Sequence, residues 1–212
     1  MPSPEDISRF RANIIDWYSK HGRKFPWRKR SLSCYAKVIA ELLLQRTRAE
    51  TVAVFYPRFI ERFPSWSDLE RATSDDLEEF LQPIGLWRRR AESMRLLARE
   101  LVRRGGRFPK TREDLESLPG IGQYMASAIL LLCHNQPQPL LDANMARVLE
   151  CFFGARELAD IRYDPYLQCL AKAVVSCKDP VAVNWAILDY ASLVCGPKIR
   201  DCSQCRRAIS VE

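Results

Sequence analysis

A glycine-rich segment between two helical stretches is the first group of residues with a recognisable chemistry. In Leu118-Pro-Gly-Ile-Gly-Gln-Tyr, Gly120 and Gly122 permit a tight hairpin. The backbone N–H groups that open the next helix then face outward, where they can bind a phosphate. We interpret the segment as a helix-hairpin-helix that binds a nucleic-acid backbone without reading its base sequence. An ordinary helix-loop-helix turn is the alternative interpretation.

Asp142 follows a proline-rich turn 20 residues after Gly122 and precedes a helix. Two interpretations fit this residue. In the first, the aspartate is an N-cap that accepts hydrogen bonds from the opening turn of the helix. In the second, its carboxylate faces the same groove as the hairpin. There it would stabilise the oxocarbenium-like sugar cation that develops when a glycosidic bond breaks.

Glu41 is an acid within an apolar helix, in Ala40-Glu-Leu-Leu-Leu-Gln-Arg-Thr, and Gln45 shares its face one turn later. A carboxyl group flanked by leucine and isoleucine often has a raised pKa, which is what an acid catalyst needs. The alternative is a glutamate on the solvent face of the helix, paired with Arg48 or Lys37.

The eight cysteines fall into two groups. Cys195, Cys202 and Cys205 lie within the last 18 residues and indicate a metal or cluster site. The others are separate from one another in apolar contexts. Because an intracellular chain rarely keeps structural disulfides, we expect these five to be small buried hydrophobic residues. They are Cys34, Cys133, Cys151, Cys169 and Cys177.

Helices are expected to position these residues, because apolar residues recur at helical spacing and no stretch alternates with period two. The connections are short and are marked by proline or glycine. The chain is therefore predicted to be all-α, with two closely packed helical lobes. Helices are predicted over residues 7–18, 89–103, 112–117, 124–133, 143–153, 165–176 and 180–195, with two more within 35–63 and one capped by Ser74.

Composition limits the class of protein. The 212 residues suit one large domain or two small ones, and 47% hydrophobic residues exclude a disordered chain. The formal net charge of +7 suits a polyanionic partner. The longest apolar run, Ala126 to Cys133, is too short to span a bilayer, and the first residues do not form a signal peptide. We expect a soluble protein of the cytoplasm or nucleus.

Motifs in a fixed order along nearly the whole chain resemble the helix-hairpin-helix Gly-Pro-Asp (HhH-GPD) superfamily of DNA glycosylases, of the endonuclease III and adenine glycosylase type. The motifs are Pro26-Trp-Arg, Glu41-Leu-Leu-Leu-Gln-Arg-Thr, Ile84-Gly-Leu, Leu118-Pro-Gly-Ile-Gly-Gln-Tyr, Leu141-Asp-Ala-Asn-Met-Ala-Arg-Val and Cys195-x6-Cys202-x2-Cys205. The resemblance implies a six-helix barrel lobe over residues 30–137 that contains the hairpin. Residues 1–29 and 138–212 would form the second lobe, with the DNA groove between the two.

The resemblance implies an enzyme that flips a nucleotide out of duplex DNA and cuts its N-glycosidic bond. Asp142 would be the family's essential aspartate, which stabilises the sugar cation and assists the attacking water. Glu41 would contact or protonate the departing base. Tyr124 occupies the position of the lysine that lets bifunctional members cut the strand, and a phenol cannot form a Schiff base. Base removal without strand cleavage is therefore implied.

The resemblance also implies contacts with DNA. Arg46 would fill the gap left by the flipped nucleotide, with Gln45 beside the pocket. Leu86 or Trp87 would be a second wedge, inserted into the opposite strand; a core aromatic is the alternative for Trp87. Further contacts are expected from Gly120, Gly122, Gln123 and Arg147, while Arg88, Arg89 and Arg90 would contact the backbone or form a solvated face.

Two substrates are consistent with this resemblance. Tyrosine at position 124 is similar to archaeal thymine-DNA mismatch glycosylases and to some adenine glycosylases. The latter usually carry a further C-terminal domain, for which a chain ending at Glu212 has no room, and Gln45-Arg46 is closer to the basic pair of the thymine group. We expect a monomer that removes thymine or uracil opposite guanine in mismatched double-stranded DNA. The alternatives are removal of adenine opposite guanine or 8-oxoguanine, and a non-catalytic module that binds lesions.

The cysteine motif departs from the family pattern, Cys-x6-Cys-x2-Cys-x5-Cys, because its last position is Val211. The three cysteines at family spacing point to a [4Fe–4S] cluster, which normally takes four thiolates and is not required for base removal. A cysteine elsewhere or another ligand completes the site, or the cluster is lost. Zinc fits less well, since the two histidines, His21 and His134, are distant in sequence.

Overall fold

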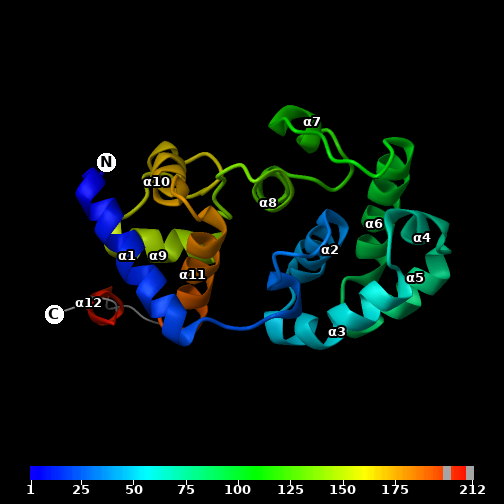
Figure 1. The fold of residues 1–212 in the computed structure, drawn as a ribbon, viewed down its shortest axis with the longest axis horizontal. Helices are drawn as coiled ribbons and strands as arrows, with labels where there is room; N and C mark the ends of the chain where they lie inside the picture. The colour runs from blue at the N-terminus through cyan, green and yellow to red at the C-terminus, as the bar shows by residue number, and fades with distance from the viewer. Residues whose placement is uncertain (198–201, 209–212) are drawn as a thin grey trace. The chain divides into compact units, whose positions relative to one another are not determined.

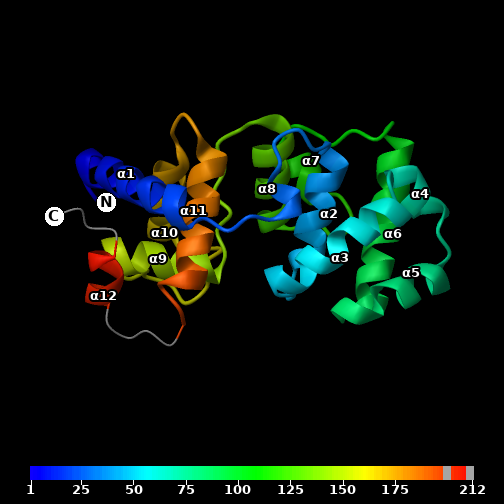
Figure 2. The same ribbon diagram turned by 60° about the horizontal axis from the view of Figure 1, so that its bottom comes forward.

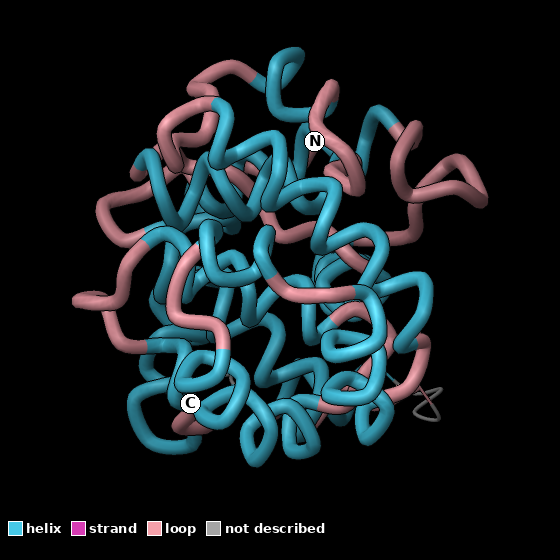
Figure 3. The backbone as a smooth tube through the Cα atoms, turned by 90° about the vertical axis from the view of Figure 1, so that its right-hand side faces the viewer, coloured by secondary structure: helices cyan, strands magenta, loops and turns pink. Residues whose placement is uncertain are grey.

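Helices joined by loops and turns build the described part of the chain, residues 1–197 and 202–208 of a computed structural model. No β-strand occurs among these residues, as Figure 3 shows, which confirms the all-α prediction. The chain divides into two compact units. Unit 1 combines residues 1–23 with 135–212, and unit 2 consists of residues 24–134 (Figure 1). No helix in the described ranges has the length and apolar character needed to cross a membrane.

Unit 2 is a group of helices around a core of aromatic and aliphatic side chains. Helices α4 and α5 pack against α6, and α2 packs against α3 and α8 (Figure 2). Leu69, Leu97 and Phe59 are fully buried where these helices meet. The helices are α2 (Cys34–Leu44), α3 (Ala49–Arg62), α4 (Trp66–Arg71), α5 (Ser74–Leu81), α6 (Trp87–Arg103), α7 (Arg112–Glu116) and α8 (Gln123–His134), with 3₁₀ turns η1 (Pro26–Arg28) and η2 (Gln82–Ile84).

Side-chain caps begin several of these helices. Ser33 caps α2 by accepting the Ala36 N–H, and Thr73 caps α5 by accepting the Asp76 N–H at 3.1 Å. The prediction that Ser74 caps α5 is wrong by one residue. Thr73 has the extended backbone of an N-cap, and Ser74 is already in the first helical turn.

A disulfide joins Cys34, at the start of α2, to Cys133, near the end of α8. The expectation that these two cysteines are separate buried hydrophobic residues is therefore wrong: α2 and α8 pack together, which brings their side chains within bonding distance. Cys151 is buried as expected. The same expectation is wrong for Cys169, which is exposed on the outer face of its helix, and Cys177 is only half-buried.

Unit 1 combines the first helix with the helices of the last third of the chain. Helix α11 packs against α1 and α9, and Ile14, Leu149 and Tyr190 are fully buried in the core they share. The helices are α1 (Pro4–His21), α9 (Ala143–Phe153), α10 (Pro165–Val175), α11 (Pro180–Leu193) and α12 (Cys202–Arg207). The short helices α4 and α12 were not predicted from the sequence.

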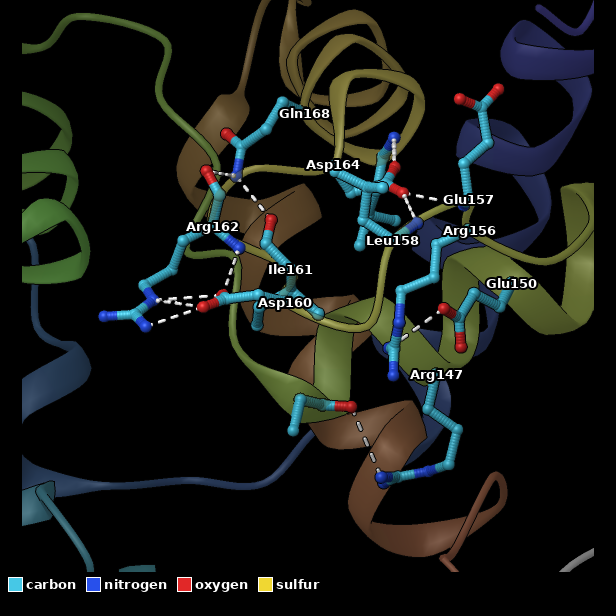
Figure 4. A network of polar contacts seen from close by, with 12 residues as sticks. Arg147, Glu150, Arg156, Glu157, Leu158, Asp160, Ile161, Arg162, Asp164 and Gln168 are labelled. Carbon is cyan, nitrogen blue, oxygen red and sulfur yellow. Dashed lines mark hydrogen bonds and ion pairs between the residues drawn. The ribbon is translucent and has the colours of Figure 1, made fainter.

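The loop between α9 and α10 is held by a buried aspartate (Figure 4). Asp164 is fully buried, and its carboxylate accepts the backbone N–H groups of Glu157, Leu158 and Leu167, each at 2.6 Å. Burial alone would raise the pKa of Asp164, but these backbone donors hold it below the ordinary value. One oxygen of its carboxylate, Oδ1, therefore caps α10, and the other, Oδ2, holds the loop.

A second buried polar side chain fixes the segment that leads into α9. Asn184, on α11, accepts the Leu140 N–H at 2.7 Å and donates to the Gln138 and Pro180 carbonyls at 3.1 and 2.8 Å. Because Asn184 is fully buried, these bonds are protected from competition with water. They hold the chain in place two residues before Asp142.

Candidate active site and cysteine cluster

The buried acid of α2 is bonded to the tyrosine of α8. Glu41 is only 6% exposed, and the Tyr124 hydroxyl donates to its Oε2 at 3.1 Å. The alternative of a glutamate on the solvent face is therefore wrong. Lys37, one of the partners considered for it, donates instead to the Leu132 carbonyl at 3.4 Å.

A pocket of about 440 Å³ in unit 2 lies beside this pair. Its walls come from the end of α2, the start of α6 and the hairpin between α7 and α8. Residues predicted from distant parts of the sequence are thus brought together in one cavity. They are Gln45, Arg46, Leu86, Gly120, Gly122 and Tyr124.

Two residues of the pocket wall have a left-handed backbone. Arg46 has φ 56° and Leu86 has φ 52°, a conformation that is costly for residues with a Cβ. Both side chains are exposed, and Leu86 is 51% accessible although it is apolar. Trp87 is half-buried against the core of unit 2, and the Arg88 guanidinium lies 4.1 Å from its ring centroid. Of the two predicted wedge residues, Leu86 and Trp87, it is thus Leu86 that lines the pocket.

Arg90 is a positioning residue that sequence reasoning missed. It is buried, and its guanidinium donates to the carbonyls of Leu42, Leu43 and Gln45 at 2.6, 2.9 and 3.1 Å. The expectation of a backbone contact or solvated face is therefore wrong for Arg90, and its burial lowers its pKa. Arg90 satisfies the carbonyls at the end of α2 and so fixes the segment that presents Gln45 and Arg46.

The predicted hairpin is observed between α7 and α8. Leu118 and Ile121 are buried beneath it, and the Ile121 N–H donates to the Leu118 carbonyl at 3.2 Å. Gly120 has φ +74°, which favours glycine, whereas Gly122 is exposed at the start of α8. Arg112 donates to Ser127 Oγ at 3.0 Å and so joins the two helices.

Asp142 caps α9 in unit 1. Its Oδ1 accepts the Asn144 and Met145 N–H groups at 2.9 and 2.8 Å, and its Oδ2 accepts the Asn144 side-chain amide at 2.8 Å. The N-cap interpretation is confirmed. The same bonds hold the half-buried carboxylate in one orientation. Its catalytic role stays a prediction.

Two further residues with predicted DNA contacts differ in their surroundings. Gln123 is exposed as the first residue of α8. Arg147 donates to the Cys195 carbonyl at 2.6 Å and to the Ala191 carbonyl at 3.2 Å. The structure gives Arg147 a role inside unit 1, where it joins α9 to the end of α11. Its contact with DNA stays a prediction.

Four cysteines converge at the end of unit 1. The sulfur atoms of Cys151, Cys195 and Cys205 all lie within 4.8 Å of one another, and all three residues are buried. Cys202 is half-buried against the same core, and the Cys151 thiol donates to its carbonyl at 3.7 Å. Burial and the neighbouring Cys205 thiol raise the pKa of Cys195 to about 11. The expected fourth position, Val211, lies outside the described residues.

This set of donors fits a thiophilic metal centre. Thiolates select iron–sulfur clusters and zinc over hard cations, and no histidine or carboxylate belongs to the group of ligand atoms found in the described residues. Sequence reasoning found three of the four cysteines from their spacing. It missed Cys151, whose proximity depends on how α9 packs against α11 and α12.

Comparison with known families and proteins gives consistent results. Residues 39–163 match the family described as "HhH-GPD superfamily base excision DNA repair protein". A protein of Pyrobaculum aerophilum named "Thymine/uracil-DNA glycosylase" is 38% identical over 100% of this chain and 94% of its own length. The "Adenine DNA glycosylase" of Rattus norvegicus is 32% identical over 94% of this chain but only 40% of its own length.

The fold has a match among solved structures. The structure of "a thermostable thymine-DNA glycosylase" superposes with a TM-score of 0.85 at 28% identity. The match covers 95% of this chain and 93% of that one.

Proposed function

Because this chain belongs to the HhH-GPD superfamily of base excision DNA repair proteins, we propose that it is a DNA glycosylase that removes thymine or uracil mispaired with guanine. The observation that carries the proposal is the pocket of unit 2, which is lined by Tyr124, the residue whose hydroxyl is bonded to the buried Glu41. Its substrate class follows the name of a relative that aligns over the full chain.

The pocket receives the flipped base. A cavity of about 440 Å³ suits one nucleobase with its sugar, and Glu41 lies next to its wall, where it orients the base or gives it a proton. Arg46 and Leu86 stand at the pocket with strained backbones and exposed side chains. They fill the space that the flipped nucleotide leaves in the duplex.

Asp142 acts on the sugar. As the bond between C1′ and the base nitrogen breaks, the electron pair goes to the base and positive charge develops on the sugar. The fixed carboxylate of Asp142 stabilises that charge and orients the attacking water. Water then adds its oxygen to C1′, its proton goes to the base, and an abasic site with a free base results.

Tyr124 makes the reaction monofunctional. A lysine amine at this position would attack C1′ and form a Schiff base, from which the strand is cut. The phenol of Tyr124 instead donates a hydrogen bond to Glu41 and holds that carboxylate at the pocket. Hydrolysis therefore stops at the abasic site.

Sequence-independent contacts hold the duplex. The hairpin around Gly120 and Gly122 presents the start of α8, where Gln123 is exposed, and such helix N-termini bind backbone phosphates. The net charge of +7 favours association with the polyanion and makes it weaken as salt rises.

The cysteine cluster is the site of an iron–sulfur centre. Cys195, Cys202 and Cys205 have the spacing of the family motif. Cys195 and Cys205 lie with Cys151 in a buried group of close sulfur atoms, against which the half-buried Cys202 packs, and this set of thiols fits iron and sulfide. A [4Fe–4S] centre bound there would cross-link the end of α11 to α12. Base removal takes no step through it.

Adenine removal is the second candidate, favoured by the 32% identity to the rat adenine glycosylase. A single experiment separates the candidates. End-labelled duplexes with a G·T, G·U or A·8-oxoguanine pair are incubated with the protein, and half of each reaction is treated with alkali. We expect the thymine and uracil strands to break only after alkali.

The other outcomes each correct a different part of the proposal. Breakage at adenine would assign the protein to the second substrate class. Breakage without alkali would mean that another nucleophile attacks the sugar and that Tyr124 was misinterpreted. Intact duplexes together with retained binding would indicate a lesion-binding module without catalysis.

A further inference from the structure

Cys151 lies outside the family's cysteine spacing and nevertheless belongs to the cluster. It is on α9, 44 residues before Cys195 in the sequence. Its sulfur is within 4.8 Å of those of Cys195 and Cys205, and the residue is only 2% exposed. With the Cys202 carbonyl 3.7 Å from its sulfur, Cys151 has all three cysteines of the family motif as neighbours, and a four-thiolate centre requires one more.

We propose that Cys151 is the fourth protein ligand of the iron–sulfur centre, in place of the side chain at position 211. The inference rests on the centre proposed above. Each of the four thiols gives up a proton, and each sulfur then bonds to one iron. The side chain of Val211 has no atom that can bind iron, so a fourth thiolate has to come from another part of the chain.

The remaining cysteines do not compete for this role. Cys34 and Cys133 are joined in a disulfide within unit 2. Cys169 is exposed on α10, and Cys177 is half-buried after it. Neither belongs to the group of close ligand atoms found in the described residues, whereas Cys151 does.

Polar groups around Cys151 and its neighbours suit a centre of negative charge. Arg206 Nε donates to the Cys151 carbonyl at 2.7 Å, and Arg147 Nε donates to the Cys195 carbonyl at 2.6 Å. Two guanidinium groups are thus fixed to the backbone of two ligands, where they offset the charge of the thiolates. Tyr190 donates to the Cys205 carbonyl and completes the enclosure.

Ligation by Cys151 attaches the centre to α9, the helix that Asp142 caps. Nine residues separate the two, which is about 13 Å along a helix axis. A ligand at position 211 would leave α9 out of the cross-link. With Cys151 as a ligand, α9, the end of α11 and α12 are joined through one group, and the helix that presents the aspartate is fixed near its other end.

The test measures iron and acid-labile sulfide per chain after anaerobic purification of the full-length protein. We expect about four of each in the wild type. Cys151→Ser should lose at least half of both, while Cys169→Ser, the matched control on α10, should keep both. Adding Val211→Cys to Cys151→Ser should restore the content, since it returns the fourth thiolate to the family's position.

Full iron and sulfide in Cys151→Ser would overturn the proposal. If that variant does not fold, as judged by circular dichroism, the double variant decides: a folded protein with the depleted content would also overturn it. Zinc in place of iron, lost in Cys151→Ser, would support the ligand but overturn the iron–sulfur centre. A wild type without any metal would overturn both, whereas base removal is measured separately by the duplex assay.

Discussion

Asp142 caps α9 and is proposed to stabilise the sugar cation, and one substitution can separate these two roles. Asparagine caps a helix as well as aspartate does, so Asp142→Asn should keep the bonds from Asn144 and Met145 while it loses the negative charge. We expect base release from a G·U duplex to fall by roughly 10³-fold or more, because the sugar cation is no longer stabilised. Single-turnover kinetics measure the loss, and a binding assay should give unchanged affinity.

The control is another N-cap aspartate. Asp179 caps α11 by accepting the Ala182 N–H at 3.1 Å, and the proposed reaction assigns it no role. Asp179→Asn should therefore release the base at the wild-type rate. Equal activity of the two variants would show that Asp142 is an N-cap only, and the assignment of the catalytic aspartate would have to be withdrawn.

If Tyr124 occupies the position of the catalytic lysine of bifunctional members, a lysine there should add strand cleavage. Tyr124→Lys places an amine beside the pocket, and we expect strand cleavage without alkali together with a covalent enzyme–DNA adduct that borohydride traps. Tyr124→Phe is the matched control, since it also loses the bond to Glu41 but gains no nucleophile. A lysine variant that binds DNA but yields no adduct would argue against the proposed position of Tyr124.

Single residues were predictable from the sequence where their type was unusual for their surroundings. Glu41 stood out as an acid in an apolar helix, and the structure shows it buried. Arg90 did not stand out among three consecutive arginines, although it occupies the apolar stripe of α6 with Met94 and Leu97. Its partners are carbonyls at the end of another helix, and no sequence pattern specifies such a contact.

At the scale of elements, length affected what could be predicted, although the five-residue helix α7 was expected from its sequence. Helices α1, α6 and α9 each run for at least three turns, so their apolar residues repeat often enough to reveal the period. Helices α4 and α12 have six residues each and show less than two turns of the pattern. Pairing between elements was not predictable, and the Cys34–Cys133 disulfide is the plainest case, because the two cysteines are 99 residues apart.

The disulfide between α2 and α8 should stabilise unit 2. Closing so long a loop restricts the unfolded chain, and such bonds typically contribute about 2–4 kcal/mol. Cys133→Ser should lower the melting temperature, and a reductant should lower that of the wild type by a similar amount. Cys169→Ser, which changes an exposed free cysteine, is the control and should melt like the wild type. A melting temperature that neither change affects would mean that the disulfide adds no stability.

At the scale of the molecule, residues that share a core are not always neighbours along the chain. The first 23 residues fold with residues 135–212, while residues 24–134 form a unit of their own between them in the sequence. Ile14 thus shares a core with Leu149 and Tyr190, and Leu97 belongs to a different core with Phe59. Proximity in the sequence is therefore a poor guide to which residues stabilise one another.

The two cores predict which helices a substitution at a buried residue will destabilise. Ile14→Ala removes a fully buried side chain and should cost about 2–5 kcal/mol. The loss should appear in hydrogen exchange as faster exchange of α9 and α11 amides, while α3 and α6 keep their protection, since only the former share the core of Ile14. Leu97→Ala, equally buried in unit 2, should show the reverse pattern. Protection lost mainly in residues next to each substitution along the chain would contradict the two-core organisation.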